Sequence, residues 1–151
     1  MTIVDKIISS IKTAMGFKFP VYYHDEPTLN VMASEMKFPC AIFQLLSSGR
    51  VERGPQARET VTAAVFFVEP ATEWDDDAVA NEVIIDRCKT NAMTWLSSLN
   101  TSGLLEASGV VRTSRVYDRY DDILTGFGVS VDLTELYGIC NNNNNNNNNN
   151  N

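Results

Sequence analysis

The chain has 151 residues, of which 44% are hydrophobic and 21% are charged. Its 19 acidic and 12 basic residues give a net charge of -7, which excludes a protein that holds nucleic acid through a broadly basic surface. We expect one domain over residues 1–140. The run 141–151 is all asparagine, and it is either a solvated polar tail or a stand-in for residues of unassigned identity.

The start of the chain and its cysteines indicate the compartment in which the protein is found. Asp5 stands where an export signal carries positive charge, and no stretch approaches the ~20 apolar residues of a membrane span. The three cysteines are far apart and form no CxxC pair, so they indicate neither a disulfide framework nor a zinc site: Cys40, Cys88 and Cys140. We expect a soluble protein in a reducing compartment.

The first predicted element is a helix over 2–15. Thr2 can cap its start, with Asp5 three positions further on. Residues 17–23 then predict a short strand, whereas 28–37 fit either a helical turn or a loop. The apolar residues of the helix share one stripe: Ile3, Ile7, Ile11 and Ala14.

Two apolar runs, 38–46 and 60–68, indicate central strands that pair as a hairpin. The segment between them, 47–59, contains Gly49, Gly54 and Pro55 and little that a core would bury. We therefore predict that 47–59 projects from the sheet as a mobile arm. This arm carries three basic residues: Arg50, Arg53 and Arg58.

A second helix is predicted over 76–99, and the acidic run 75–77 suits the positive end of its dipole. Residues 110–117 indicate a strand, and 123–133 alternate with period two as a further strand. Between these strands, 118–122 form the turn of a second hairpin. The apolar face of the helix comprises Ala80, Ile84, Cys88, Ala92, Trp95 and Leu99.

This order of elements determines the fold class. The helices are too few and too widely spaced for alternating βαβ units. We predict an α+β domain with a mostly antiparallel sheet of four to five strands and two main helices packed on one face.

Enzymatic signatures are weak in this sequence. The single histidine, His24, lies in a polar turn without a nucleophile motif, so a surface position is the simpler interpretation. Gly126 and Gly128 lie inside an alternating strand, where they indicate a bulge or a close-packed neighbour and not a phosphate loop. We expect no enzyme activity and no cofactor.

Acidic residues cluster twice, once before the second helix and once at the second hairpin tip. Neither cluster has the spacing of a known metal site. A helix start and a polar hairpin tip are the simpler interpretations, and we expect no bound metal. The two clusters are Asp75, Asp76 and Asp77, and Asp118, Asp121 and Asp122.

Basic residues gather on the arm and on the second hairpin, where they are Arg112, Arg115 and Arg119. An acidic helix start and two basic protrusions on one small domain are what head-to-tail self-association requires, because unlike patches then meet between neighbours. The predicted contact residues are Arg50, Arg53, Arg58, Arg115, Arg119, Asp121 and Asp122.

The layout resembles that of tail-terminator and head-to-tail joining (tail completion) proteins of tailed bacteriophages, particularly phages and prophages of Bacteroides-like hosts. The similarity extends over most of residues 1–140. It is carried by the helix Ile3–Met15, the strand introduced by Phe38-Pro39, the arginine-rich excursion before Val61–Val68, the helix Asp76–Leu99 and the hairpin Arg115–Gly126 with its strand to Leu133.

The resemblance implies a structural virion protein, assembled in the host cytoplasm, that forms a ring at the head-proximal end of the tail. Such rings are commonly hexameric; they end tube growth and present a docking surface to the head. The implied partners are further copies of the chain, the tail tube and the head connector. DNA would pass through without specific binding, which suits an acidic chain.

Two alternatives stay open at this stage. One is a monomeric or dimeric binding or adaptor module of phage assembly, with exposed apolar residues at a strand edge or Trp74 as its contact. The other is a small metal-dependent hydrolase that uses Asp118, Asp121 and Asp122.

Overall fold

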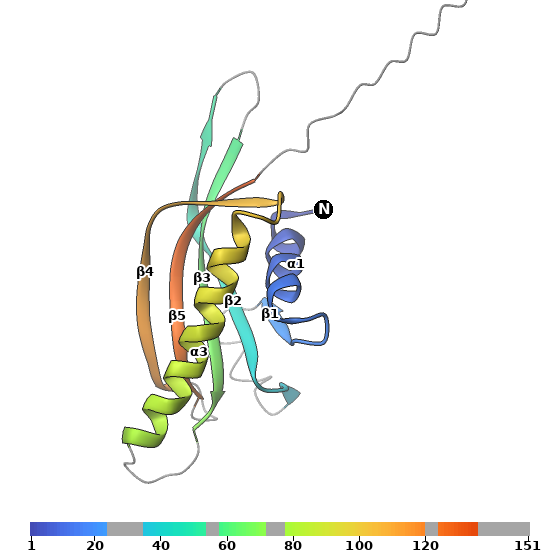
Figure 1. The fold of residues 1–151 in the computed structure, drawn as a ribbon. Helices are drawn as coiled ribbons and strands as arrows, with labels where there is room; N and C mark the ends of the chain where they lie inside the picture. Colours follow the sequence, from blue (N-terminus) through green and yellow to red (C-terminus); the bar gives the residue numbers. More distant parts are fainter. Residues whose placement is uncertain (24–34, 54–57, 72–77, 120–123, 136–151) are drawn as a thin grey trace, which may run out of the picture.

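A computed structural model describes residues 1–23, 35–53, 58–71, 78–119 and 124–135. It confirms an α+β fold (Figure 1). The elements in chain order are α1 (Ile3–Met15), β1 (Val21–Tyr23), β2 (Cys40–Glu52), β3 (Arg58–Pro70), α3 (Ala78–Leu99), β4 (Leu105–Arg119) and β5 (Leu124–Glu135).

The described strands form one sheet in the order β1-β2-β3-β5-β4. β1 pairs with β2 in parallel, and the other three pairings are antiparallel. A mostly antiparallel sheet is therefore confirmed. Of the region 28–37, where a helical turn and a loop were both open, residues 28–34 lie outside the described residues. Neither helix among the residues described combines the length and the apolar character needed to cross a bilayer.

Helix α1 begins as its sequence predicts. The Asp5 N–H donates to Thr2 Oγ1 over 3.2 Å, and the Thr2 N–H donates to Asp5 Oδ2 over 2.9 Å. These two bonds satisfy backbone N–H groups at the start of the helix and so fix where α1 begins. The Thr2 hydroxyl also donates to Asp5 Oδ2, over 2.7 Å, and this bond together with the one from the Thr2 N–H holds the pKa of Asp5 below its ordinary value.

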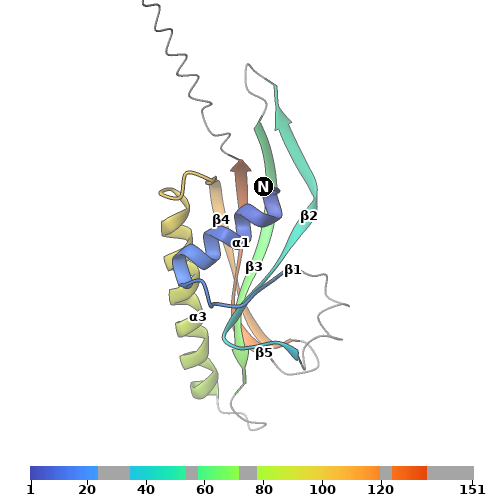
Figure 2. The same ribbon diagram turned by 90° about the vertical axis from the view of Figure 1, so that its right-hand side faces the viewer.

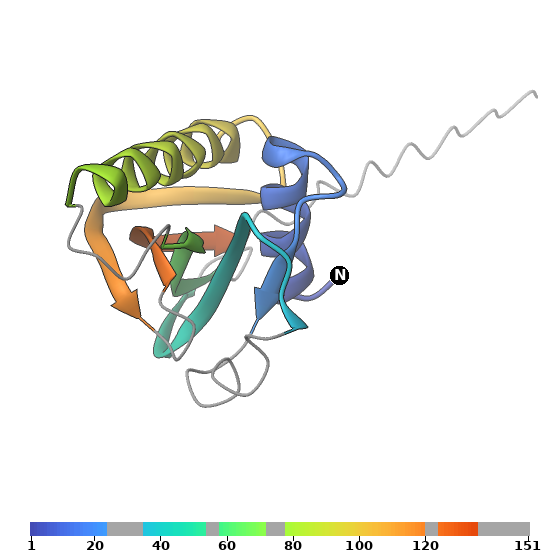
Figure 3. The ribbon, with the colours of Figure 1, turned by 90° about the horizontal axis from the view of Figure 1, so that it is seen from below.

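The main core combines residues of both helices with alternate residues of β3 and β5. Strand β3 contributes Val61, Ala63, Val65 and Phe67 to it, which is the period-two pattern of a strand with one face buried in this core. Figure 3 shows α3 lying over the strands with α1 next to its C-terminal half. The helical members of this core are Ile7, Ile11, Ile84, Ile85, Cys88, Ala92, Trp95 and Leu99.

Trp95 joins the two helices at the centre of this core. Its side chain is fully buried, and its Nε1–H donates to Ser10 Oγ over 2.9 Å. The Ser10 hydroxyl in turn donates to the carbonyl oxygen of Ile7 over 2.7 Å. The indole nitrogen and the hydroxyl are therefore both satisfied inside the core.

A nearly buried ion pair ties α1 to the end of β5. Lys6 Nζ lies 2.8 Å from Glu135 Oε1, and the two side chains are only 12% and 11% exposed. Loss of either partner would leave a charge in a poorly solvated position, which is costly.

The arm differs from its predicted form. The sequence predicted an unpaired excursion over 47–59, but β2 stays paired with β3 as far as Glu52, which lies opposite Arg58. A register shift between Leu45 and Gly49 takes up the extra residues of β2. The arm is therefore a two-stranded ribbon that projects past the neighbouring strands (Figure 1, Figure 2).

Strand β4 is also longer than the predicted 110–117. It begins at Leu105, five residues earlier than predicted, and it contains a register shift between Ser108 and Arg112. Gly109 lies within this shift with a φ of +74°, a conformation that favours glycine. This shift breaks the alternation that sequence reading depends on.

Gly126 confirms the interpretation that a neighbour packs closely against β5. A Cβ atom added there would lie 2.0 Å from the carbonyl oxygen of Phe67 in β3. At Gly128 the nearest atom would be Cδ1 of Phe66, at 2.6 Å. Both glycines therefore allow β5 to approach β3 and its side chains.

We predict that Ser10→Ala lowers the free energy of unfolding by about 1–3 kcal/mol, because it leaves the buried Trp95 N–H without an acceptor. Urea unfolding followed by tryptophan fluorescence measures this. Ser97→Ala is the matched control, since Ser97 is exposed and bonds only to its own helix; its change should stay within about 0.5 kcal/mol. Equal changes for the two variants would contradict the role given to Ser10.

We predict that Gly126→Ala costs about 3 kcal/mol or more, because the blocking atom belongs to the backbone and cannot rotate away. Ser130→Ala on the same strand is the control and should be close to neutral. Thermal unfolding of both variants by circular dichroism checks this, and an unchanged melting temperature for Gly126→Ala would refute it.

Candidate functional site

The three predicted arginines of the arm are all exposed. Arg50 lies opposite Thr60 in the β2–β3 ladder, Arg58 lies opposite Glu52, and Arg53 follows the end of β2. None of them belongs to an ion pair among the described residues. The arm therefore presents three exposed guanidinium groups that form no ion pair with any side chain that the structure describes.

Arg115, also a predicted contact residue, has partners within the chain. Its guanidinium pairs with the carboxylate of Glu82 on α3, and the Tyr117 hydroxyl donates to Glu82 Oε1 over 3.2 Å. The hydrogen bond from Arg115 lowers the pKa of Glu82 from its ordinary value. The pair lies on the surface and links β4 to α3.

For the remaining predicted contact residues, the structure describes only the backbone of Arg119. Arg119 pairs with Leu124 in the β4–β5 ladder. Asp121 and Asp122 lie outside the described residues. The structure thus brings Arg50, Arg53 and Arg58 together on the arm and keeps Arg115 apart from them.

The sheet face that points away from the main core changes character along its length. At one end a small apolar cluster, which contains no residue of α1 or α3, comprises Met36, Cys40, Ile42, Val68, Val116 and Leu124. Towards the arm the face becomes polar. We call this part the polar face; it carries Thr60, Thr62, Ser130, Asp132 and Thr134.

Two hydrogen bonds organise the polar face. The Thr62 hydroxyl donates to Asp132 Oδ1 over 2.6 Å, and the hydroxyls of Thr60 and Thr134 lie 2.8 Å apart. In both cases the residues are direct partners in the β3–β5 ladder, so their side chains share one face.

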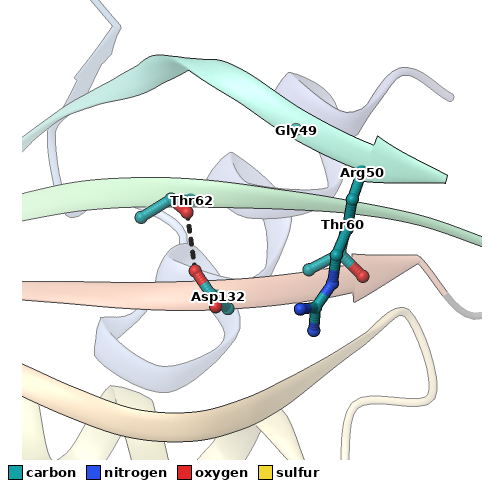
Figure 4. Close-up of a pocket in the computed structure, with 5 residues that line it drawn as sticks. All are labelled: Gly49, Arg50, Thr60, Thr62 and Asp132. Carbon is teal, nitrogen blue, oxygen red and sulfur yellow. Dashed lines mark hydrogen bonds between the residues drawn. The ribbon is translucent and has the colours of Figure 1, made fainter.

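A hollow of about 230 Å³ lies where the polar face meets the arm (Figure 4). Figure 4 shows the Arg50 side chain crossing β3 toward β5, near Thr60. The lining residues are Gly49, Arg50, Thr60, Thr62 and Asp132.

A second hollow, of about 430 Å³, adjoins the first because both are lined by Thr62 and Asp132. It extends the depression across β5 to β4, where Arg112 and the strongly exposed Val110 border it. We call the two hollows together the trough. The second is lined by Leu46, Thr62, Val110, Arg112, Ser130 and Asp132.

Sequence reading missed the trough, although a signal for it existed. Residues 60–68 were interpreted as an apolar run of a central strand, yet Thr60 and Thr62 occupy alternate positions at their start. Ser130, Asp132 and Thr134 alternate in the same way on β5, and the register sets the two rows side by side.

Residues with metal or nucleophile chemistry do not converge in the described part of the chain. No group of three or more His, Cys, Asp or Glu side chains there is placed to hold a metal ion. His24, Asp75–Asp77, Asp121 and Asp122 lie outside this part.

Cys40 and Cys88 are buried free thiols. Burial raises the pKa of each to about 12. Both side chains are therefore protonated near neutral pH, when a thiol is a poor nucleophile.

Comparison of the chain with protein-family models gave no match, and comparison with curated proteins gave none either.

We predict that the carboxyl group of Glu82 titrates below 4.5 and that Arg115→Met moves its midpoint up toward that value. Because the folded pKa is the lower one, the contribution of the pair to stability is present above pH 4.5 and is lost as the pH falls through the folded pKa. Carbon-detected NMR titration of side-chain carboxyls measures the titration midpoint of Glu82 in both proteins. Arg87→Met, which affects the separate pair with Glu69, should leave the midpoint of Glu82 unchanged.

Proposed function

We propose that the protein is a structural virion component that forms a ring at the head-proximal end of a phage tail, ends growth of the tube and joins tail to head. The observation that carries this proposal is the projecting β2–β3 arm with Arg50, Arg53 and Arg58 exposed and without ion pairs among the described residues. A rigid domain with a charged extension suits contacts between repeated subunits.

The distribution of apolar contacts gives further support. We propose that both helices pack on the same face of the sheet, since α1 and α3 contribute to one core with the same strand residues. The opposite face, with its polar half and its trough, is then available for contacts with other proteins.

The charge balance fits the same function. The chain carries a net charge of -7, so a channel lined by copies of it would repel the DNA backbone. The partners in this proposal are further copies of the chain, in a ring that we take to be hexameric, together with the tail tube and the head connector.

A binding or adaptor module of phage assembly is the second candidate. It is favoured by Val79 and Val83 on α3, whose side chains are 72% and 53% exposed. They border a hollow of about 470 Å³ between α3 and β4, which a partner's apolar side chain could fill. A monomer that captures a tail protein without forming a ring would favour this candidate.

We predict that the purified protein has the mass of several subunits and that replacing Arg50, Arg53 and Arg58 together by Glu lowers this mass while the fold survives. Exposed charges contribute little to folding but much to association between complementary surfaces. Light scattering after gel filtration at two salt concentrations, with electron microscopy of the same fractions, measures the outcome. A variant that unfolds, or one that assembles as the parent does, would count against the arm as a ring contact.

A further inference from the structure

The trough on the polar face has an unbalanced charge. Arg50 borders one side and Arg112 the other, and both are exposed. Neither belongs to an ion pair among the described residues. Asp132, between them, already accepts the Thr62 hydroxyl. Two guanidinium groups therefore face a single carboxylate, which leaves the trough positive on a chain whose net charge is -7.

The threonine hydroxyls of the trough already have hydrogen-bond partners. Thr60 and Thr134 satisfy each other, and Thr62 is satisfied by Asp132. An occupant is therefore selected by the two guanidinium groups and by the exposed apolar side chains at the rim, Leu46 and Val110. This combination matches a peptide with several carboxylates and an apolar residue among them.

The chain itself contains such a peptide in Glu73-Trp74-Asp75-Asp76-Asp77. It precedes Ala78, the first residue of α3, and α3 begins at the end of the sheet opposite the arm (Figure 1). On β3 alone, Thr62 and Pro70 are eight residues apart, about 26 Å of extended strand. Asp75 is three residues from Ala78, a reach of about 10 Å at most. A segment with this reach, starting at the opposite end of the sheet, does not extend to the Arg50 end of the trough in its own copy.

We propose that the trough binds the acidic segment Glu73–Asp77 of a second copy of this chain. This inference rests on the proposed ring and names one of its contacts. The donor and acceptor surfaces differ, so each copy uses both, and the contact repeats head to tail as a closed ring requires. Arg50 and Arg112 pair with the carboxylates, and Trp74 lies against the apolar rim.

The test uses the full chain and a fluorescein-labelled peptide of residues 70–78, with binding followed by fluorescence anisotropy at low salt. Arg50→Glu with Arg112→Glu should weaken binding at least tenfold, and the difference should shrink at high salt. Asp132→Asn keeps an acceptor for Thr62 but removes the opposing charge, so it should tighten binding two- to threefold. Lys89→Glu is the matched control, because Lys89 is an exposed cation outside the trough, and it should bind as the parent does.

Several outcomes would overturn the inference. The first is that the peptide does not bind. The second is that Lys89→Glu weakens peptide binding as much as the double arginine reversal does. The third is that inorganic phosphate or a duplex oligonucleotide displaces the peptide at equal concentration. Light scattering separates this inference from the ring itself. A multimer whose mass survives reversal of Arg50 and Arg112 keeps the ring but removes this contact, whereas a strict monomer whose trough binds the peptide keeps the contact but removes the ring.

Discussion

The hydrogen bond from Trp95 to Ser10 is the constraint on which the rest of the structure depends. It sets the rotation of α3 about its own axis, because a buried indole N–H must meet an acceptor. With Trp95 held, the same face of α3 presents Cys88 and Ala92 to the strands and leaves Glu82 outside, within reach of Arg115. One buried polar contact therefore specifies which side of a long helix is core and which is surface.

The two faces of the sheet differ in chemistry. Alternate residues of β3 and β5 supply apolar side chains to the core that also contains residues of α1 and α3. On the other face, the same strands carry Ser130 and two hydrogen-bonded pairs, Thr60 with Thr134 and Thr62 with Asp132. Gly126 allows the two strands to lie close together, because a side chain there would collide with the backbone of β3.

Much of the fold was predictable from local patterns. The capping residues of α1, the apolar stripe of α3 and the alternation of β5 are encoded within short windows, and each occurs where predicted. The arm and β4 were less predictable, because Gly49 and Gly109 look like loop residues but lie within paired strands. Strand pairing, which local sequence does not record, decides their structure.

The candidate site also has one part that was predictable from the sequence and one that was not. Arg50, Arg53 and Arg58 were recognisable because they gather within nine residues of sequence. The trough was not, since it combines Arg50 with Asp132 and Arg112 through the register of four strands. Such a site becomes visible only once the sheet order is known, and no periodicity within a single strand indicates it.

The ion pair between Lys6 and Glu135 favours circular permutation of the chain. It fastens the first helix to the last described strand, so the path of the described backbone nearly closes on itself. A short linker from the end of β5 to the start of α1 would join ends that are already neighbours, and new ends could be opened elsewhere in the fold.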